Sequence, residues 1–206
     1  DLMHRGGISA IAMNGATAIH DVEIAMCGNT SEDVAESLKD GSFGMARDTG
    51  DFINHAVRDA QSGYGQALGQ KILDTHLPHQ KQSILATARK LDIPVTVHVA
   101  LGTDFVHQQP SADGAAIGRA SYEDFRLFCS VIASLEGGAY LNIGSAVILP
   151  EVFLKALTVA RNLGHKVQNF ITANFDMIQH YRPQVNVVQR PTQDGGKGYT
   201  FTGHHE

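Results

Sequence analysis

The sequence predicts an α/β protein with a Rossmann-like, doubly wound, mostly parallel sheet and helices on both faces. Three observations lead to this prediction: four short apolar runs, the small and polar residues in which each run ends, and the helical patterns between them. Buried parallel strands have such runs because helices cover both of their faces. Ligands of open α/β sheets bind at the carboxyl ends of the strands, so the same four ends are where a functional site is expected.

Composition limits the class of protein. The chain has 206 residues, 43% hydrophobic and 18% charged, which is typical of one α/β domain spanning residues 1–206. A net charge of −5 without a basic stretch argues against a nucleic-acid partner. No apolar run approaches the roughly 18 residues of a membrane span. The sequence shows no signal peptide. Its two cysteines, Cys27 and Cys129, lie in unrelated contexts and are expected to be free thiols, so a cytoplasmic location is expected. The chain starts at Asp1 and soon reaches a strand, so an amino-terminal portion is expected to be missing.

The first half of the chain is expected to hold two strands with helices between them. The strands are the apolar runs at residues 6–13 and 94–100, each followed by small and polar residues. Helices are expected where acidic residues mark a first turn or where apolar residues recur at helical spacing. They span residues 30–38, 49–62, 67–73 and 80–91.

In the second half, residues 105–121 form the longest irregular stretch, and a long loop of this kind is usually functional or mobile. An amphipathic helix is expected over 122–135, and another over 150–163, where Pro150 occupies the first turn. Strands are expected at four places, of which the last two are weaker candidates. They are residues 139–143, 169–173, 185–188 and 199–202.

The turn after the first strand is the first candidate site. Asn14, Gly15 and Thr17 are small or polar and would let a ligand approach the backbone. His20 and Asp21 follow and add polar groups that a plain turn does not need, so we expect them on the substrate side. The G-x-G-x-x-G fingerprint of dinucleotide-binding turns is absent. A simple capped turn explains the same residues equally well.

The end of the second strand supplies Thr103 and Asp104, and a carboxylate at this place commonly binds ribose hydroxyls or substrate amines. His98, inside the strand, is expected to be a buried structural histidine. Together with His107 it also allows a metal-dependent hydrolase. The spacing matches no metal motif, so no metal ion is expected.

The ends of the third and fourth strands complete the set. Gly144 and Ser145 precede a helix, and small residues at a helix N-terminus suit phosphate. Asp176 and His180 follow the fourth strand and are candidates for contact with a ribose or a cationic substrate.

At these four strand ends the chain resembles the deoxyhypusine synthase family, and it looks closest to the divergent bacterial deoxyhypusine-synthase-like branch. The family's Thr-Ala-Gly-Gly turn is similar to Asn14–Thr17, and its Thr-Asp to Thr103–Asp104. Its Gly-Gly-Gly cradle is similar to Gly144–Ala146, and its Asn-Thr-Ala strand end to Ile171–Ala173. The match is one of order and spacing and covers most of the chain.

The resemblance implies a Rossmann-like fold that binds NAD without the usual fingerprint, in a homo-oligomer that is commonly a tetramer. NAD would then contact residues at all four strand ends: Asn14, Gly15, Thr17, Thr103, Asp104, Gly144, Ser145, Thr172 and Ala173. The family oxidises a polyamine with NAD and carries the product on a lysine that follows an Arg-Pro. Here Arg182–Pro183 is followed by a segment without Lys or Trp, so the carrier lysine is not found.

Three functions follow from these observations. The first is an NAD-dependent enzyme acting on an amine or polyamine-like substrate, with His20, Asp21, Asp176 and His180 on the substrate side. The second is a non-catalytic nucleotide-binding or scaffold protein of the same fold. The third is the metal-dependent hydrolase.

Overall fold

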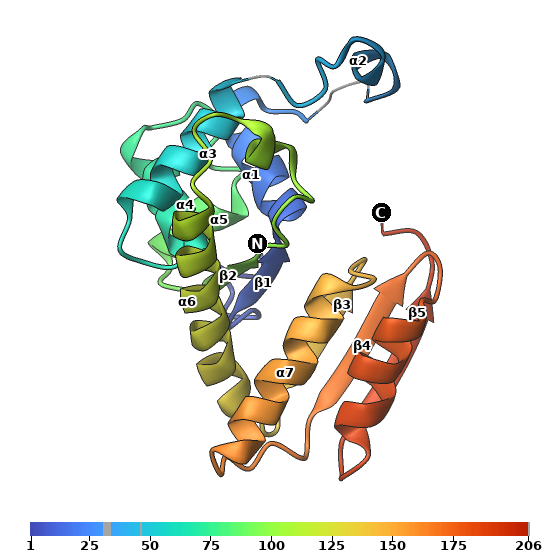
Figure 1. Ribbon diagram of the computed structural model, residues 1–206. Coiled ribbons are helices and arrows are strands. Elements are labelled where there is room, and N and C mark those ends of the chain that lie inside the picture. The colour runs from blue at the N-terminus through green and yellow to red at the C-terminus, as the bar shows by residue number, and fades with distance from the viewer. Residues whose placement is uncertain (31–33, 46, 206) are drawn as a thin grey trace. The chain divides into compact units, whose positions relative to one another are not determined.

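The computed structural model describes residues 1–30, 34–45 and 47–205 and has a mixed α/β fold with two small parallel sheets (Figure 1). The chain divides into two compact units, residues 1–124 and 125–206. The α/β class is therefore confirmed, whereas the predicted single domain stays a prediction. In the described ranges the strands form one two-stranded and one three-stranded sheet. No helix in these ranges is long and apolar enough to cross a membrane.

The first unit is built around two parallel strands, β1 (Ile11–Asn14) and β2 (Val95–His98), paired so that Asn14 lies opposite His98. Among the described residues between these strands there are five helices: α1 (Gly15–Cys27), α2 (Val34–Asp40), α3 (Arg47–Asp59), α4 (Tyr64–Asp74) and α5 (Ile84–Lys90). After β2 come a short 3₁₀ helix, η1 (Phe105–Gln108), and the long helix α6 (Gly114–Ala133). The helix expected at 30–38 is present from residue 34, and its expected start at 31–33 lies outside the described residues.

The core of this unit is formed where apolar faces of the helices meet the two strands. Its members are almost inaccessible to water and include Val22 of α1, Ile53 and Val57 of α3, Leu68 of α4 and Val97 of β2. Burial of each such side chain contributes about 1.5–3 kcal/mol. The helical periodicity in the sequence identified the buried faces of α3 and α4, whereas α1, which carries Val22, was not expected as a helix.

The buried carboxylate of Asp124 in α6 links α4 and β2 through hydrogen bonds. Its side chain is 1% exposed, and its Oδ2 accepts hydrogen bonds from the backbone N–H of Gly65, at 2.9 Å, and of Val97, at 2.7 Å. One carboxylate thus accepts hydrogen bonds from a backbone N–H at the start of α4 and from another in β2. Burial raises the pKa of Asp124 to about 7, against the lowering effect of these hydrogen bonds.

The second unit contains the parallel sheet of β3 (Ala139–Ile143), β4 (Ile171–Asp176) and β5 (Lys197–Thr202), in that order. One face is covered by α7 (Ile148–Asn162) and by a helical segment formed by α8 (Tyr181–Pro183), η2 (Gln184–Gln189) and η3 (Arg190–Thr192). The ring of Tyr140 stacks on Phe153 of α7 at 3.9 Å, and the Thr172 hydroxyl donates to the carbonyl of Val187 at 2.8 Å. Leu141 and Phe201, on the other face, are about half exposed.

Three expectations about element boundaries were wrong. The first strand starts at Ile11, because residues 1–6 form turns closed by the bond from Gly7 N–H to Leu2 O. The helix expected at 122–135 starts at Gly114, since Asp113 accepts hydrogen bonds from the next turn and caps it. The stretch 105–121 is therefore mostly helical. The fourth strand continues to Asp176, three residues beyond its expected end.

The strand expected at 185–188 was also wrong, because these residues lie in the π-helical segment η2. Pro183 occupies its start, where the missing N–H costs nothing. The strand expected at 199–202 is confirmed as part of β5.

Replacement of Asp124 tests how much its hydrogen bonds to Gly65 and Val97 stabilise the first unit. Asp124→Ala leaves two buried backbone N–H groups without an acceptor, which costs about 1–3 kcal/mol each, so the free energy of unfolding should fall by about 2–6 kcal/mol. Asp124→Asn keeps one acceptor oxygen and should lose less. Urea denaturation of both variants measures the difference, and equal losses for Ala and Asn would contradict this role. Asp92→Asn, at a fully exposed side chain, is the control.

Candidate functional site

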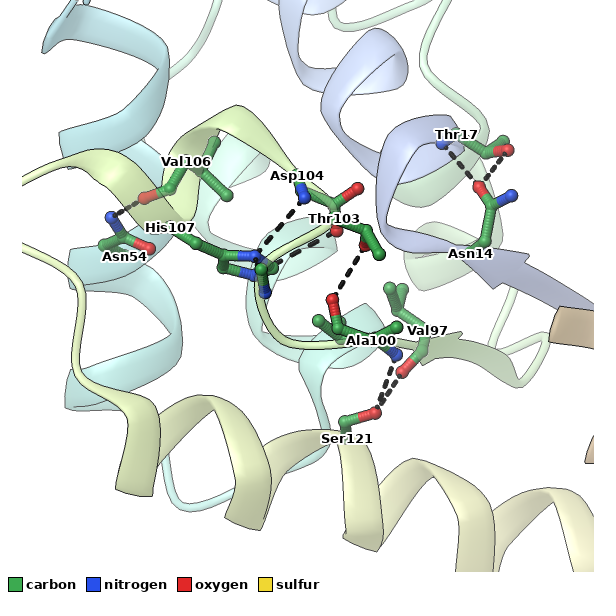
Figure 2. A network of polar contacts seen from close by, with 12 residues as sticks. Asn14, Thr17, Asn54, Val97, Ala100, Thr103, Asp104, Val106, His107 and Ser121 are labelled. Carbon is green, nitrogen blue, oxygen red and sulfur yellow. Dashed lines mark hydrogen bonds and ion pairs between the residues drawn. The ribbon is translucent and has the colours of Figure 1, made fainter. Parts of the chain in front are cut away.

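The carboxyl ends of β1 and β2 meet at one edge of the small sheet, as the sequence predicts for parallel strands. β1 passes directly into α1, while β2 passes into the loop 99–104. Figure 2 shows this loop beside the first turn of α1, with Thr103 and Asp104 next to the segment that carries Asn14 and Thr17. The first two groups of predicted site residues are therefore brought together within one unit.

Asn14 and Thr17 form the cap of α1. Oδ1 of Asn14 accepts hydrogen bonds from the backbone N–H of Thr17 at 2.9 Å and from its hydroxyl at 2.8 Å. This arrangement supplies an acceptor that the first turn of any helix needs. Capping therefore accounts for both side chains, and only the exposed edge of Thr17 remains open to a ligand.

Gly15 is required by its contact with Asp104. A Cβ atom at Gly15 would overlap the Asp104 carboxylate, so the carboxylate lies directly over the start of α1. Burial raises the pKa of Asp104, while the nearby His107 lowers it. The positive end of the α1 dipole already faces this carboxylate, so the space suits a hydrogen-bond donor better than a phosphate.

His107 supports the Asp104 loop from behind. Its Nδ1 accepts hydrogen bonds from the backbone N–H of Gly102, at 3.1 Å, and of Asp104, at 3.4 Å. In the neutral ring the proton must then be on Nε2, which lies 4.0 Å from Oδ2 of Asp104. Nε2 is buried, and among the described residues it has no hydrogen-bond partner. The ring thus fixes the shape of the loop and keeps one donor near the carboxylate.

A pocket of about 470 Å³ lies in front of Asp104. Its walls come from α1, from the loop before α3 and from the segment 102–108: Ala16, Ile19, His20, Phe43, Gly102, Thr103, Asp104, Phe105, His107 and Gln108. Three predicted site residues, His20, Thr103 and Asp104, line it. The lining combines apolar side chains with the carboxylate of Asp104. Such a site fits a ligand with a flat or apolar part next to hydroxyl or amine donors.

Asp21 lies in the interior instead of facing the pocket. Its carboxylate accepts hydrogen bonds from the Ser83 hydroxyl at 2.6 Å and from the backbone N–H groups of Ile84, at 2.7 Å, and Leu85, at 3.0 Å. Asp21 is 5% exposed, and burial raises its pKa. The side chain caps α5 from α1, and this placement does not support the catalytic role predicted for it.

His98 is buried in β2, as expected for a structural histidine, with Nε2 2.9 Å from the Thr96 hydroxyl. Burial lowers the pKa of His98 to about 4, so the ring is neutral at physiological pH. Across the described ranges, no three His, Cys, Asp or Glu side chains gather closely enough to hold a metal ion. His98, Asp104 and His107 are therefore not assembled into the metal site that the hydrolase hypothesis needs.

The second unit has its own strand-end turn at Gly144 and Ser145. Gly144 has a φ of +66°, and the Ser145 Oγ accepts a hydrogen bond from the N–H of Leu149 in the first turn of α7 at 3.2 Å. The ring of His205 lies beside Gly144, with Nε2 3.3 Å from the carbonyl of Phe175. This turn is the part of the predicted site best suited to an anion, because it precedes a helix of 15 residues.

Amide side chains fill the neighbouring strand ends. Asn142 donates to Asn174 Oδ1 at 2.7 Å, and Asn174 donates to Gln179 Oε1 at 2.8 Å. Oδ2 of Asp176 is buried and, in the part of the chain that is described, has no hydrogen-bond partner. An unpaired buried carboxylate oxygen is costly, so a donor from a ligand would stabilise this site.

The remaining predicted residues of this unit differ in accessibility. Thr172 and Ala173 lie inside β4, before its end at Asp176, and both are buried. The Thr172 hydroxyl is already used by Val187, so this placement does not support the predicted cofactor contacts. His180 is exposed at the start of α8.

Sequence reasoning missed the apolar wall of the pocket. Phe43 lies in a turn cluster, and Ile19 and Phe105 carry no motif. The two phenylalanines are half-buried, and nothing in the local sequence distinguishes them from ordinary core residues. Only the folded chain brings them to the same pocket as Asp104.

In comparisons with protein-family models, with curated proteins and with solved structures, nothing matches this chain.

Asp21→Ala should reduce stability without changing the pocket. The Ser83 hydroxyl and two backbone N–H groups would lose their acceptor, so the free energy of unfolding should fall by about 2–4 kcal/mol. Asp48→Ala, on the exposed part of α3, should change it by less than about 1 kcal/mol. Thermal or urea denaturation measures both, and a stability equal to that of the Asp48 variant would reject the capping role.

His98 should make the protein less stable in mild acid. Its pKa of about 4 in the folded state lies below the usual value of 6.5, so the unfolded chain binds the proton first. Stability should therefore fall as the pH drops from about 6.5 to about 4, by about 3 kcal/mol in total.

Buried carboxyl groups with raised pKa values change stability in the opposite direction, and they do so equally in the wild type and in His98→Gln. The difference between the two proteins therefore isolates the contribution of His98. Urea denaturation at several pH values should show a flatter acid loss for the variant. Parallel profiles for variant and wild type would show that His98 is not the group responsible.

Proposed function

We propose that this chain binds NAD at the strand ends of its first unit and acts on an amine or polyamine-like substrate. The observation that carries the proposal is the Asp104 carboxylate, seated against Gly15 at the joined ends of β1 and β2 and lining an open pocket. A carboxylate in this position accepts hydrogen bonds from ribose hydroxyls in many dinucleotide-binding sheets. Thr103, beside it, also lines the pocket; its hydroxyl donates to the carbonyl of Ala100 at 2.7 Å, so only its oxygen could accept from a ligand.

The turn at Gly144 and Ser145 of the second unit is proposed separately, as an anion-binding turn. It precedes α7, and a helix N-terminus carries partial positive charge. The pocket at Asp104 has no lysine or arginine among its described lining residues, which favours the uncharged sugar and base there.

Substrate chemistry is proposed for three of the predicted residues. In the first unit, His20 lines the pocket. In the second unit, taken by itself, His180 is exposed at the start of α8. Asp176 of that unit has a buried oxygen without a partner among the described residues, which an ammonium group would satisfy. NAD would supply the redox chemistry, and the protein would position the substrate. Gln184–Gln189, after Arg182–Pro183, form a helical turn without lysine, so no covalent imine is proposed there.

The finer structural expectations belong to the same proposal. They are a Rossmann-like, doubly wound sheet, a homo-oligomer of the deoxyhypusine-synthase-like type and a cytoplasmic location. Both cysteines, Cys27 and Cys129, have free thiols, which suits a reducing compartment.

A non-catalytic nucleotide-binding protein is the second candidate, and the missing carrier lysine favours it. Incubation with NAD and a panel of polyamines discriminates between the two by absorbance near 340 nm. Reduced cofactor formed with any amine supports the enzyme. Its absence with every amine, in protein that binds NAD, supports the binding module.

NAD binding is the direct test of the proposal. Calorimetry should show binding to the dialysed protein, and Asp104→Asn should weaken it about tenfold or more, because a charge-assisted hydrogen bond to the ribose is lost. Asp92→Asn makes the same charge change at an exposed residue on the other end of β2 and should bind as the wild type does. Absence of NAD binding, or equal affinity for the two variants, would reject the proposal.

A further inference from the structure

Phe43 enters the pocket from a part of the chain that carries no predicted site residue. It lies in the segment 41–45 that follows α2, and it lines the same pocket as Asp104. Phe105 lines the same pocket from η1 and Ile19 from α1. The apolar side of the pocket is therefore assembled from three separate elements.

The segment that carries Phe43 is seated closely on η1. Gly44, the next residue, has a φ of +70°, and a Cβ atom there would lie 2.6 Å from Cβ of Phe105. A larger residue would clash, so the backbone at Gly44 lies directly against the side chain of Phe105. Because Gly44 is buried in this position, Phe43 is directed to the pocket rim rather than into solvent.

Gln109 holds the same segment by a hydrogen bond. Its Nε2 donates to the carbonyl of Gly44 at 2.5 Å, and the side chain is 4% exposed. A buried hydrogen bond of this kind resists opening, because either partner would be left unsatisfied. Phe43 and Phe105 are thus two rings held by the same local contacts.

We infer that Phe43 and Phe105 form the wall against which the planar base of a nucleoside lies, while its ribose lies at Asp104. The inference rests on the proposed function, since it assigns the nucleoside part of the dinucleotide to this pocket. Aromatic side chains bind nucleic-acid bases through their faces with little dependence on which base is present. The Asp104 carboxylate, in the same pocket, would then accept hydrogen bonds from the sugar hydroxyls.

The composition of the pocket favours a nucleoside over a polyamine. A polyamine carries several positive charges, and each ammonium group that is buried needs an acidic partner. Asp104 is the single carboxylate among the ten described residues that line the pocket, and four of the ten are Ala16, Ile19, Phe43 and Phe105. A neutral base and a sugar match this surface, whereas a polycation would leave charges unpaired.

Substitution of Phe43 tests the wall, with NAD, adenosine and spermidine as probes in calorimetry. Phe43→Ala should weaken binding of NAD and adenosine about tenfold or more, whereas Phe43→Tyr keeps the ring and should retain affinity. Leu38→Ala, on the exposed part of α2 and outside the pocket, is the matched control. Spermidine should not displace adenosine from the wild-type protein.

The outcomes separate this inference from the proposed function. NAD binding that is equal in Phe43→Ala and Leu38→Ala overturns the aromatic wall and leaves NAD binding intact. Displacement of adenosine by spermidine also overturns it. Adenosine binding that depends on Phe43, in a protein that does not bind NAD, supports the nucleoside wall and rejects the proposed cofactor. Absence of binding by both NAD and adenosine rejects both proposals.

Discussion

The parallel register of β1 with β2 is the constraint on which the candidate site depends. With Asn14 opposite His98, both strands end at the same edge, so the first turn of α1 must lie beside the loop that follows β2. The Asp104 carboxylate then occupies the space over Gly15, which a Cβ atom would fill. A shift of the register by one residue would turn the strand side chains to the opposite face and separate these groups. The pocket therefore exists because of this pairing.

Two buried carboxylates of the first unit accept hydrogen bonds from backbone N–H groups. Asp21 accepts hydrogen bonds at the start of α5, and Asp124 accepts them from the start of α4 and from β2. Helices of 7 and 11 residues gain little stability from propensity alone, so acceptors at their first turns matter. Burial raises the pKa of both groups, which shows that a perturbed carboxyl group here is a sign of structure as much as of chemistry.

Asp104 differs from those two residues because it reaches an open pocket. Its loop is fixed by hydrogen bonds to His107, and Asp104 lines the same pocket as Ile19, Phe43 and Phe105. A fixed carboxylate in a pocket with apolar side chains favours ligands that have hydrogen-bond donors next to a flat apolar surface. This combination, rather than any single residue, supports a nucleoside as the ligand.

The sequence by itself determined the α/β class, most of the helices and the order of the strand ends, because hydrophobic periodicity is a local property. The closeness of Asn14 and Gly15 to Asp104 was predicted for the same reason, since parallel strands deliver their ends to one edge. The sequence did not show that Asp21 turns inward to cap α5, or that Thr172 is buried inside β4. It also missed Phe43, whose position depends on the fit of Gly44 against Phe105. Only the tertiary structure decided these points, because each depends on contacts between segments far apart along the chain.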